Sequence, residues 1–266
     1  MLHDLIPITH PEYCVPGMAA RHERRVDTLL ATAACIVTNS MATLESLRAH
    51  GARIGRPLPP SLACPIAPRR LPPGDTTSPL ASPYFVMIGT IEPRKNHLLV
   101  LQIWRELAAR GPAPRLVLSG QRGWECENTV DLLERCGALR PLVVERGGCD
   151  DAEMATYLRH ARALLFPSFV EGYGLPLAEA LLLGTPVIAS DLEVFREVAG
   201  DVPDYLSPLD AVGWMRLITA YAEPGSASRG AQLQRLREWR APSWERHFRT
   251  VDAFLATLRQ GHHGGG

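Results

Sequence analysis

Short apolar runs alternate with amphipathic segments through most of this chain, and that alternation leaves few folds open to it. Five runs have the length of a strand: residues 84–89, 115–119, 142–144, 163–167 and 187–190. Between the first two, Val100, Ile103, Trp104 and Leu107 repeat at helical spacing and form one apolar stripe. Strands that are apolar on both faces and separated by helices are typical of a doubly wound parallel sheet. We therefore expect an α/β fold.

Residues 57–83 separate this pattern from the start of the chain. They hold nine prolines, which lack the backbone donor that a helix interior or a central strand requires, so we expect a linker. The preceding residues 1–56 predict a short apolar strand, a helix, a second strand and a second helix, at 2–6, 18–34, 35–38 and 40–50. A Rossmann-like domain needs about twice as much chain. We expect residues 1–56 to be the last part of an N-terminal domain whose beginning is absent.

The C-terminal domain is expected to cover residues 84–240 and to be followed by one more helix. A helix over 241–260 is predicted by the start signal Pro-Ser and by an apolar stripe of Trp244, Phe248, Val251, Leu255 and Leu258. The last residues, 261–266, consist of glycine and histidine, and we expect a disordered tail.

The charge balance argues against polyanionic partners. Lys and Arg total 28, as do Asp and Glu, so no overall field favours nucleic acid. Six scattered cysteines without a Cys-x-x-Cys pair fit reduced thiols better than disulfides or a zinc module. No run of about 18 apolar residues could span a bilayer, and the start has no signal-peptide pattern. We expect a cytoplasmic protein that does not bind nucleic acid.

Two adjacent cations follow the predicted strand at 84–89. Ligands of open α/β sheets bind outside the carboxyl ends of the strands, and Gly89 permits a close approach to the backbone there. Arg94 and Lys95 could clamp a diphosphate, the guanidinium as a fork and the ammonium as a point charge. Taken alone, Arg-Lys in a loop is more often solvated surface.

A second candidate segment follows the run at 163–167. Gly172 and Gly174 permit a tight turn whose amides would converge, with the N-terminus of the next helix, on an anion. Glu171 lies in the turn and Glu179 about one turn into that helix. Their carboxylates could accept hydrogen bonds from paired hydroxyls of a sugar and a ribose. For this turn alone, a glycine turn with an ordinary exposed glutamate is the simpler explanation.

Together, the two segments resemble a known family. Glu-x7-Glu after Phe-Pro-Ser, with Gly-Thr-Ile-Glu-Pro-Arg-Lys-Asn about eighty residues earlier, is similar to retaining glycosyltransferase family 4, notably its bacterial mannosyltransferase-like members. The resemblance runs from His3 to about residue 260. It implies a GT-B-like fold with one nearly complete C-terminal Rossmann-like domain, the last part of an N-terminal one, and a terminal helix that returns toward the N-terminal side.

The resemblance also assigns roles to residues. Arg94 and Lys95 would hold the donor diphosphate, Glu171 the donor sugar and Glu179 the ribose. Further donor contacts would come from Gly89, Gly172, Tyr173, Gly174 and Leu175. His3, in the run His-Asp-Leu-Ile-Pro, looks like the family's strand-end histidine, which contacts the donor sugar near its reacting carbon. A lone histidine is more often structural.

The implied reaction moves a sugar from GDP-mannose or a UDP-sugar to a hydroxyl of a saccharide or lipid-linked acceptor, with retention, in cell-surface polysaccharide or glycolipid synthesis. Residues 89–97 favour mannose. No Asp-x-Asp motif occurs, so we expect neither a metal nor another cofactor. The basic run 21–25 leaves open a contact with lipid headgroups at the inner face of the plasma membrane. Two alternatives stay open: a non-catalytic nucleotide-sugar-binding remnant, and a GT-B sugar-nucleotide epimerase.

Overall fold

The computed structural model describes the backbone of residues 1–263 and the side chains of residues 1–260. The chain divides into two compact units, and each is described by itself. Unit 1 comprises Met1–Pro68, Glu171–Gly174 and the C-terminal segment from Arg240, and unit 2 comprises Arg69–Val170 and Leu175–Trp239. The first division falls inside the predicted linker.

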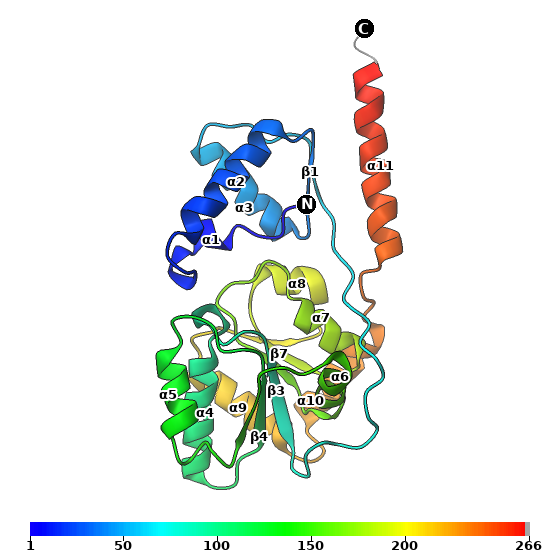
Figure 1. The fold of residues 1–266 in the computed structure, drawn as a ribbon. Helices are drawn as coiled ribbons and strands as arrows, with labels where there is room; N and C mark the ends of the chain where they lie inside the picture. Colours follow the sequence, from blue (N-terminus) through cyan, green and yellow to red (C-terminus); the bar gives the residue numbers. More distant parts are fainter. Residues whose placement is uncertain (264–266) are drawn as a thin grey trace. The chain divides into compact units, whose positions relative to one another are not determined.

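Unit 2 alternates strands with helices, as the apolar runs predict (Figure 1). Its strands are β3 (Tyr84–Ile88), β4 (Arg115–Ser119), β5 (Val143–Arg146), β6 (Leu164–Phe166), β7 (Val187–Ser190) and β8 (Asp204–Leu206). Its helices are η2 (Pro93–Lys95), α4 (His97–Arg110), α5 (Glu127–Arg135), α6 (Asp151–His160), α7 (Leu175–Leu182), α8 (Glu193–Ala199), α9 (Ala211–Ala222) and α10 (Ala227–Glu238). The sequence did not indicate β8, because this three-residue strand is only half-buried and has no apolar run.

The strands of unit 2 form one parallel sheet in the order β5-β4-β3-β6-β7-β8. Val86 of β3 is in register with Val117 of β4 on one side and with Leu164 of β6 on the other. This is the strand order of a Rossmann-type sheet, with the first strand at the centre. The direction in which strands are added reverses between β3 and β6.

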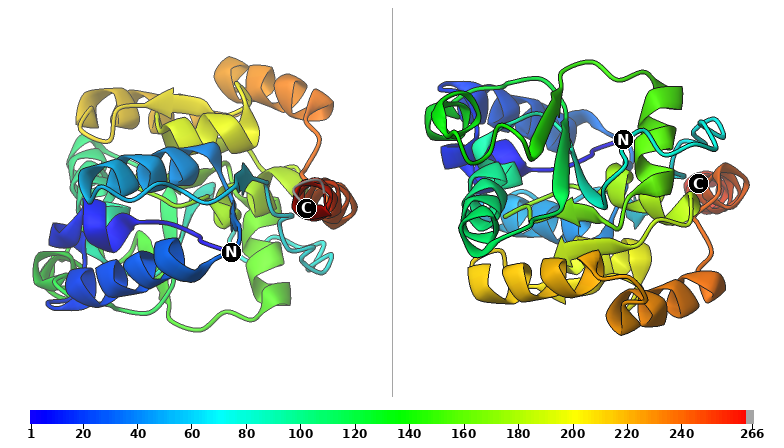
Figure 2. Two further views of the ribbon diagram at one scale, coloured as in Figure 1. Left: turned by 90° about the horizontal axis from the view of Figure 1, so that it is seen from above. Right: turned by 90° about the horizontal axis from the view of Figure 1, so that it is seen from below.

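Alternate side chains of β3 pack on opposite faces of the sheet. Phe85 and Met87 belong to a buried cluster with residues of α4 and α9, including Trp104. Tyr84 points the other way, and its hydroxyl donates to the backbone oxygen of Tyr157 on α6, at 2.9 Å. Helices therefore cover both faces, with α4 and α5 on one side and α6 on the other (Figures 1 and 2).

Unit 1 contains a two-stranded parallel sheet and several helices. Its elements are α1 (Ile6–Thr9), η1 (Pro11–Tyr13), α2 (Met18–Thr32), β1 (Ile36–Thr38), α3 (Met41–Arg53), β2 (Ser61–Ala63) and α11 (Trp244–His263). A small core holds Leu5, Val26, Leu30, Ile36 and Leu47. Leu2 forms one parallel bridge with Thr38, but the predicted apolar start is not a strand, because α1 already begins at Ile6, whose amide is bonded to Asp4 Oδ1.

Strand β2 corrects the prediction that residues 57–83 lack strands. Residues 61–64 are free of proline, so their amides remain available as donors, and Cys64 N donates to Thr38 O at 2.9 Å. The helix predicted over 241–260 is present as α11 and continues to His263, whereas the rest of the predicted tail, 264–266, lies outside the described residues. Trp244 and Phe248 of its apolar stripe are exposed. Among helices in the described part of the chain, none is long and apolar enough to cross a membrane.

Candidate functional site

The reversal between β3 and β6 marks the place in unit 2 where a ligand is expected. In open α/β sheets, ligands bind at the carboxyl ends of the strands where the strand order reverses. The loop after β3 carries Gly89, Arg94 and Lys95, and the segment after β6 leads through Val170 toward α7. Two of the segments predicted from the sequence therefore start from neighbouring strands.

Lys95 lies between the ends of these two strands. It ends the short helix η2 and is only 7 % exposed. A Cβ on Gly89, where φ is +134°, would lie 3.3 Å from Lys95 Cε, so the lysine stem passes over this glycine. The ammonium is 4.8 Å from the centroid of the Phe166 ring at the end of β6. The burial excludes a fully solvated surface lysine.

Arg94 joins the loop after β3 to the segment after β6. Its Nε contacts Glu92 Oε1 at 2.7 Å, and both side chains are largely buried. Its Nη1 donates to Val170 O at 3.4 Å, while its own backbone oxygen accepts from Phe169 N at 2.8 Å. The guanidinium is thus held close to the segment of unit 2 that follows β6.

Asn96 and Glu92 are supporting residues to which the sequence assigned no role. Asn96 adopts a left-handed conformation (φ 59°, ψ 36°), which asparagine tolerates better than most residues. Its amide donates to Pro167 O at 3.2 Å and to Pro208 O at 2.9 Å. Both residues belong to the Glu-Pro-Arg-Lys-Asn motif, so the sequence contained a signal for them. Their supporting contacts become visible only in the structure.

His97, the next residue, is a neutral histidine inside unit 2. It is 3 % exposed, and its Nδ1 is buried without a hydrogen-bond partner in the described structure. Burial, followed by the nearby charge of Lys95, lowers its pKa to about 3. The imidazole is therefore uncharged at neutral pH.

Glu179 lies on α7 with its side chain only 4 % exposed. Arg69 donates to this carboxylate from Nε at 2.8 Å and from Nη2 at 3.5 Å. Arg69 also contacts Asp151 Oδ1 at 3.1 Å, and the hydrogen bond and charge of Glu179 are the main causes of its raised pKa. The sequence did not indicate Arg69, because it stands in the proline-rich segment with no periodic pattern around it.

In unit 1, the turn Glu171–Gly174 packs against the first residues of the chain. A Cβ on Gly172 would lie 2.8 Å from both His3 O and Asp4 Cβ, so only glycine fits without a shift. Ser40 Oγ lies 3.1 Å from Gly172 O and also accepts from Thr43 N, which caps α3. Unit 1 thus places His3, which is exposed, beside the predicted sugar-binding turn.

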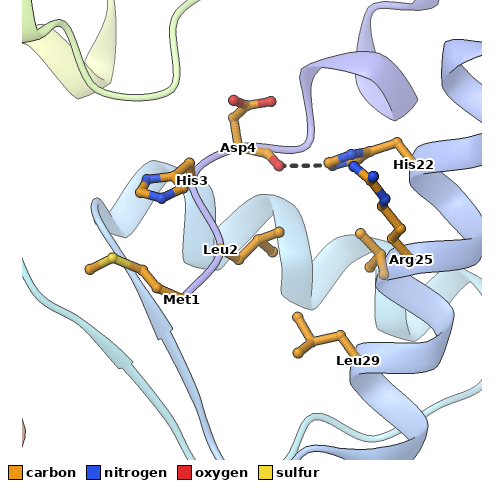
Figure 3. Close-up of a pocket in the computed structure, with 8 residues that line it drawn as sticks. Met1, Leu2, His3, Asp4, His22, Arg25 and Leu29 are labelled. Carbon is orange, nitrogen blue, oxygen red and sulfur yellow. Dashed lines mark hydrogen bonds between the residues drawn. The ribbon is translucent and has the colours of Figure 1, made fainter.

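The rest of this turn is fixed by one tyrosine and one glycine. Tyr173 donates its hydroxyl to Ile66 O at 2.6 Å, and Gly174 has a φ of +100°, which L side chains rarely adopt. A pocket of about 330 Å³ opens beside His3 (Figure 3). Figure 3 shows His22, Arg25 and Leu29 projecting into it from α2, with His22 Nε2 3.1 Å from Asp4 O.

The predicted site residues therefore fall into two groups. Unit 2 holds Gly89, Arg94, Lys95, Leu175 and Glu179, and unit 1 holds His3, Glu171, Gly172, Tyr173 and Gly174. The roles of these residues stay predictions.

Comparison with known proteins shows which enzymes this chain resembles. Residues 73–203, which include β3 to β7, match the family model described as glycosyl transferases group 1. This segment is therefore similar to group 1 glycosyltransferases, and the match covers just under half of the chain. The predicted α/β, GT-B-like fold class is confirmed, because the chain resembles the sucrose-phosphate synthase of Thermosynechococcus elongatus with a TM-score of 0.66. The match is 21 % identical and covers 97 % of this chain and 67 % of that one.

Several mannosyltransferases are similar to this chain in sequence. The O-antigen chain mannosyltransferase B of Escherichia coli is 32 % identical over 254 residues, covering 91 % of this chain and 66 % of the relative. The serotype-specific mannosyltransferase WbdA of Escherichia coli is 27 % identical over 249 residues, covering 85 % of this chain but 31 % of the relative. The chain thus spans less than two thirds of the length of either relative.

Proposed function

We propose that the chain acts in a retaining glycosyltransferase that moves a hexose, with mannose favoured, from a nucleotide diphosphate sugar to an acceptor hydroxyl in polysaccharide or glycolipid synthesis. The observation that carries the proposal is the pair Arg94 and Lys95, held largely buried where the strand order reverses in a glycosyltransferase domain. The mannosyltransferase relatives support the choice of mannose.

The two cations act on the leaving group. Transfer breaks the bond between the anomeric carbon and the diphosphate oxygen and forms a bond from that carbon to the acceptor oxygen, while the proton of the acceptor hydroxyl passes to the departing phosphate. Negative charge grows on the diphosphate in the transition state. Arg94 and Lys95 stabilise this charge without reorganising, because their side chains are already fixed by Glu92, Gly89 and Phe166.

The remaining predicted residues would bind the rest of the donor. Glu179 would accept hydrogen bonds from the ribose hydroxyls, Glu171 from the sugar hydroxyls, and His3 would contact the sugar near its reacting carbon. The glycine turn would offer backbone amides to the phosphate and sugar. We propose that no metal or other cofactor takes part, since the sequence lacks an Asp-x-Asp motif.

The acceptor in this proposal is a saccharide or a lipid-linked saccharide, and the reaction takes place on the cytoplasmic side of the membrane. Arg21, Arg24 and Arg25 are exposed on α2, which supports a peripheral contact with anionic headgroups. A retained catalytic pair gives no support to a binding-only remnant, but that alternative is tested by the same assay.

The test is to incubate the chain with GDP-mannose or UDP-glucose and with oligosaccharide or lipid-linked acceptors, with and without EDTA. We expect mannosyl transfer from GDP-mannose that survives EDTA, with the anomeric configuration of the donor kept in the product by NMR. Arg94→Ala should abolish transfer, whereas Arg105→Ala, an exposed arginine of α4, should not. Binding without transfer would support the remnant, an epimerised nucleotide sugar would support the epimerase, and an inverted product would refute retention.

A further inference from the structure

The contact between Arg69 and Glu179 differs from a surface ion pair because one of its partners, Glu179, is buried. The Glu179 side chain lies on α7 among buried apolar residues and is 4 % exposed, whereas the Arg69 side chain is 60 % exposed. Arg69 contacts both oxygens of the carboxylate. A buried carboxylate needs hydrogen-bond donors to replace the water it has lost, and Arg69 donates to both oxygens of Glu179.

We propose that Arg69 is a positioning residue for nucleotide binding, which holds the Glu179 carboxylate in the orientation that accepts the ribose hydroxyls. This inference rests on the proposed function, in which Glu179 binds the ribose. It assigns a binding task to a segment that the sequence identifies only as a linker.

The hydrogen-bonding capacity of the carboxylate permits both partners at once. Two carboxylate oxygens offer about four acceptor positions. Arg69 occupies one on each oxygen, at 2.8 Å and 3.5 Å, which leaves one position on each oxygen for a vicinal diol. The orientation is further fixed from outside, because Asp151 at the start of α6 holds Nη1 of the same guanidinium at 3.1 Å.

The experiment measures dissociation constants of the full chain by calorimetry, with GDP and with 2′,3′-dideoxy-GDP as probes. Wild type should bind GDP more tightly than the dideoxy nucleotide by roughly tenfold or more, the ratio expected from losing a charge-assisted hydrogen bond. In Arg69→Ala this ratio should fall to about one, mainly through weaker GDP binding. Arg69→Lys keeps a cation but loses the fork, so it should restore part of the ratio.

Two controls separate this role from a general effect on folding. Arg70→Ala removes the neighbouring exposed arginine and should leave both constants unchanged. The double variant Arg69→Ala, Glu179→Ala should bind GDP no more weakly than Glu179→Ala alone, because Arg69 acts through Glu179. Circular dichroism checks that each variant is folded. If Arg69→Ala does not fold, Arg69→Lys is used in its place to measure the loss of ribose discrimination.

The outcomes distinguish this inference from the proposed function. If Glu179→Ala loses the ribose discrimination but Arg69→Ala and Arg69→Lys keep it, Arg69 does not position Glu179 and the inference fails. Tighter GDP binding by Arg69→Ala would also overturn it, since Arg69 would then compete with the nucleotide. If Glu179→Ala itself discriminates as wild type does, the ribose lies elsewhere and the proposed role of Glu179 fails first.

Discussion

Replacing Lys95 with methionine separates the charge of this residue from its packing. Methionine is unbranched and of similar length, so Lys95→Met should still pass over Gly89 and fill the space beside Phe166. What the variant loses is the ammonium, which lies 4.8 Å from the Phe166 centroid and, in our account, contacts the donor diphosphate. We predict a folded protein with impaired nucleotide binding.

The expected change in folding stability is small compared with the expected change in GDP affinity. Loss of the cation–π contact lowers the free energy of unfolding by about 0.5–2 kcal/mol. Part of this loss is offset, because methionine places no charge at a position that is only 7 % exposed. The net change of about 1 kcal/mol shifts the melting temperature by roughly 2–4 °C. Loss of a charge-assisted contact to the diphosphate costs about 1.5–3 kcal/mol, which weakens GDP binding by roughly 10- to 150-fold.

The assay pairs calorimetry with GDP and thermal unfolding by circular dichroism, on wild type, Lys95→Met and Arg105→Met. Arg105 is an exposed cation of α4, so its replacement should change neither the dissociation constant nor the melting temperature. If Lys95→Met melts much earlier than wild type yet binds GDP equally well per folded molecule, Lys95 is structural and the diphosphate does not contact it.

Three further predictions concern stability. Gly172→Ala should cost roughly 1–3 kcal/mol in denaturant unfolding, because its Cβ would lie 2.8 Å from His3 O, whereas Gly137→Ala, with nothing within 4 Å, should cost nothing. Ser40→Ala should cost about 1–2 kcal/mol as the cap of α3, against less than about 0.5 kcal/mol for Ser46→Ala on the same helix; equal losses would contradict this role. His97 has a folded pKa of about 3, below its unfolded value of about 6.5, so the unfolded chain binds the proton first and stability falls as the pH drops through this range. His97→Leu should flatten that fall between pH 6.5 and pH 4, and an unchanged slope would show that other groups cause it.

Much of the sheet was predictable because buried parallel strands are apolar on both faces. The runs around Val86, Val117, Leu164 and Ile188 all became central strands of unit 2. Strand β8 was not predicted, because Asp204-Tyr205-Leu206 is half-buried and its extended conformation depends on pairing with β7. Residues 57–83 are irregular outside β2, as their proline content predicts. Strand β2 was missed because pairing with β1 needs only a few consecutive residues with a free backbone amide.

The site was predictable where residue type sets the chemistry, and unpredictable where distant contacts set it. Arg94 and Lys95 were marked by their place after a strand, and Gly172 by its freedom from a Cβ. The side chains and strands that contact these groups could not be predicted. Arg69 is 110 residues from Glu179 in the chain, so no local pattern could connect them. Likewise, the burial of Lys95 follows from the neighbouring strand β6, which no property of the loop itself reveals.

The most direct test of the central claim is hydrogen exchange of the full chain, followed by mass spectrometry, with and without GDP-mannose. The proposed donor site lies at the carboxyl ends of β3 and β6. We therefore expect slower exchange in peptides covering residues 89–97 and the start of α7, with no change in α5 (Glu127–Arg135). Protection of α5 with none at residues 89–97 would contradict the account, because the nucleotide sugar would then bind at another place in the domain.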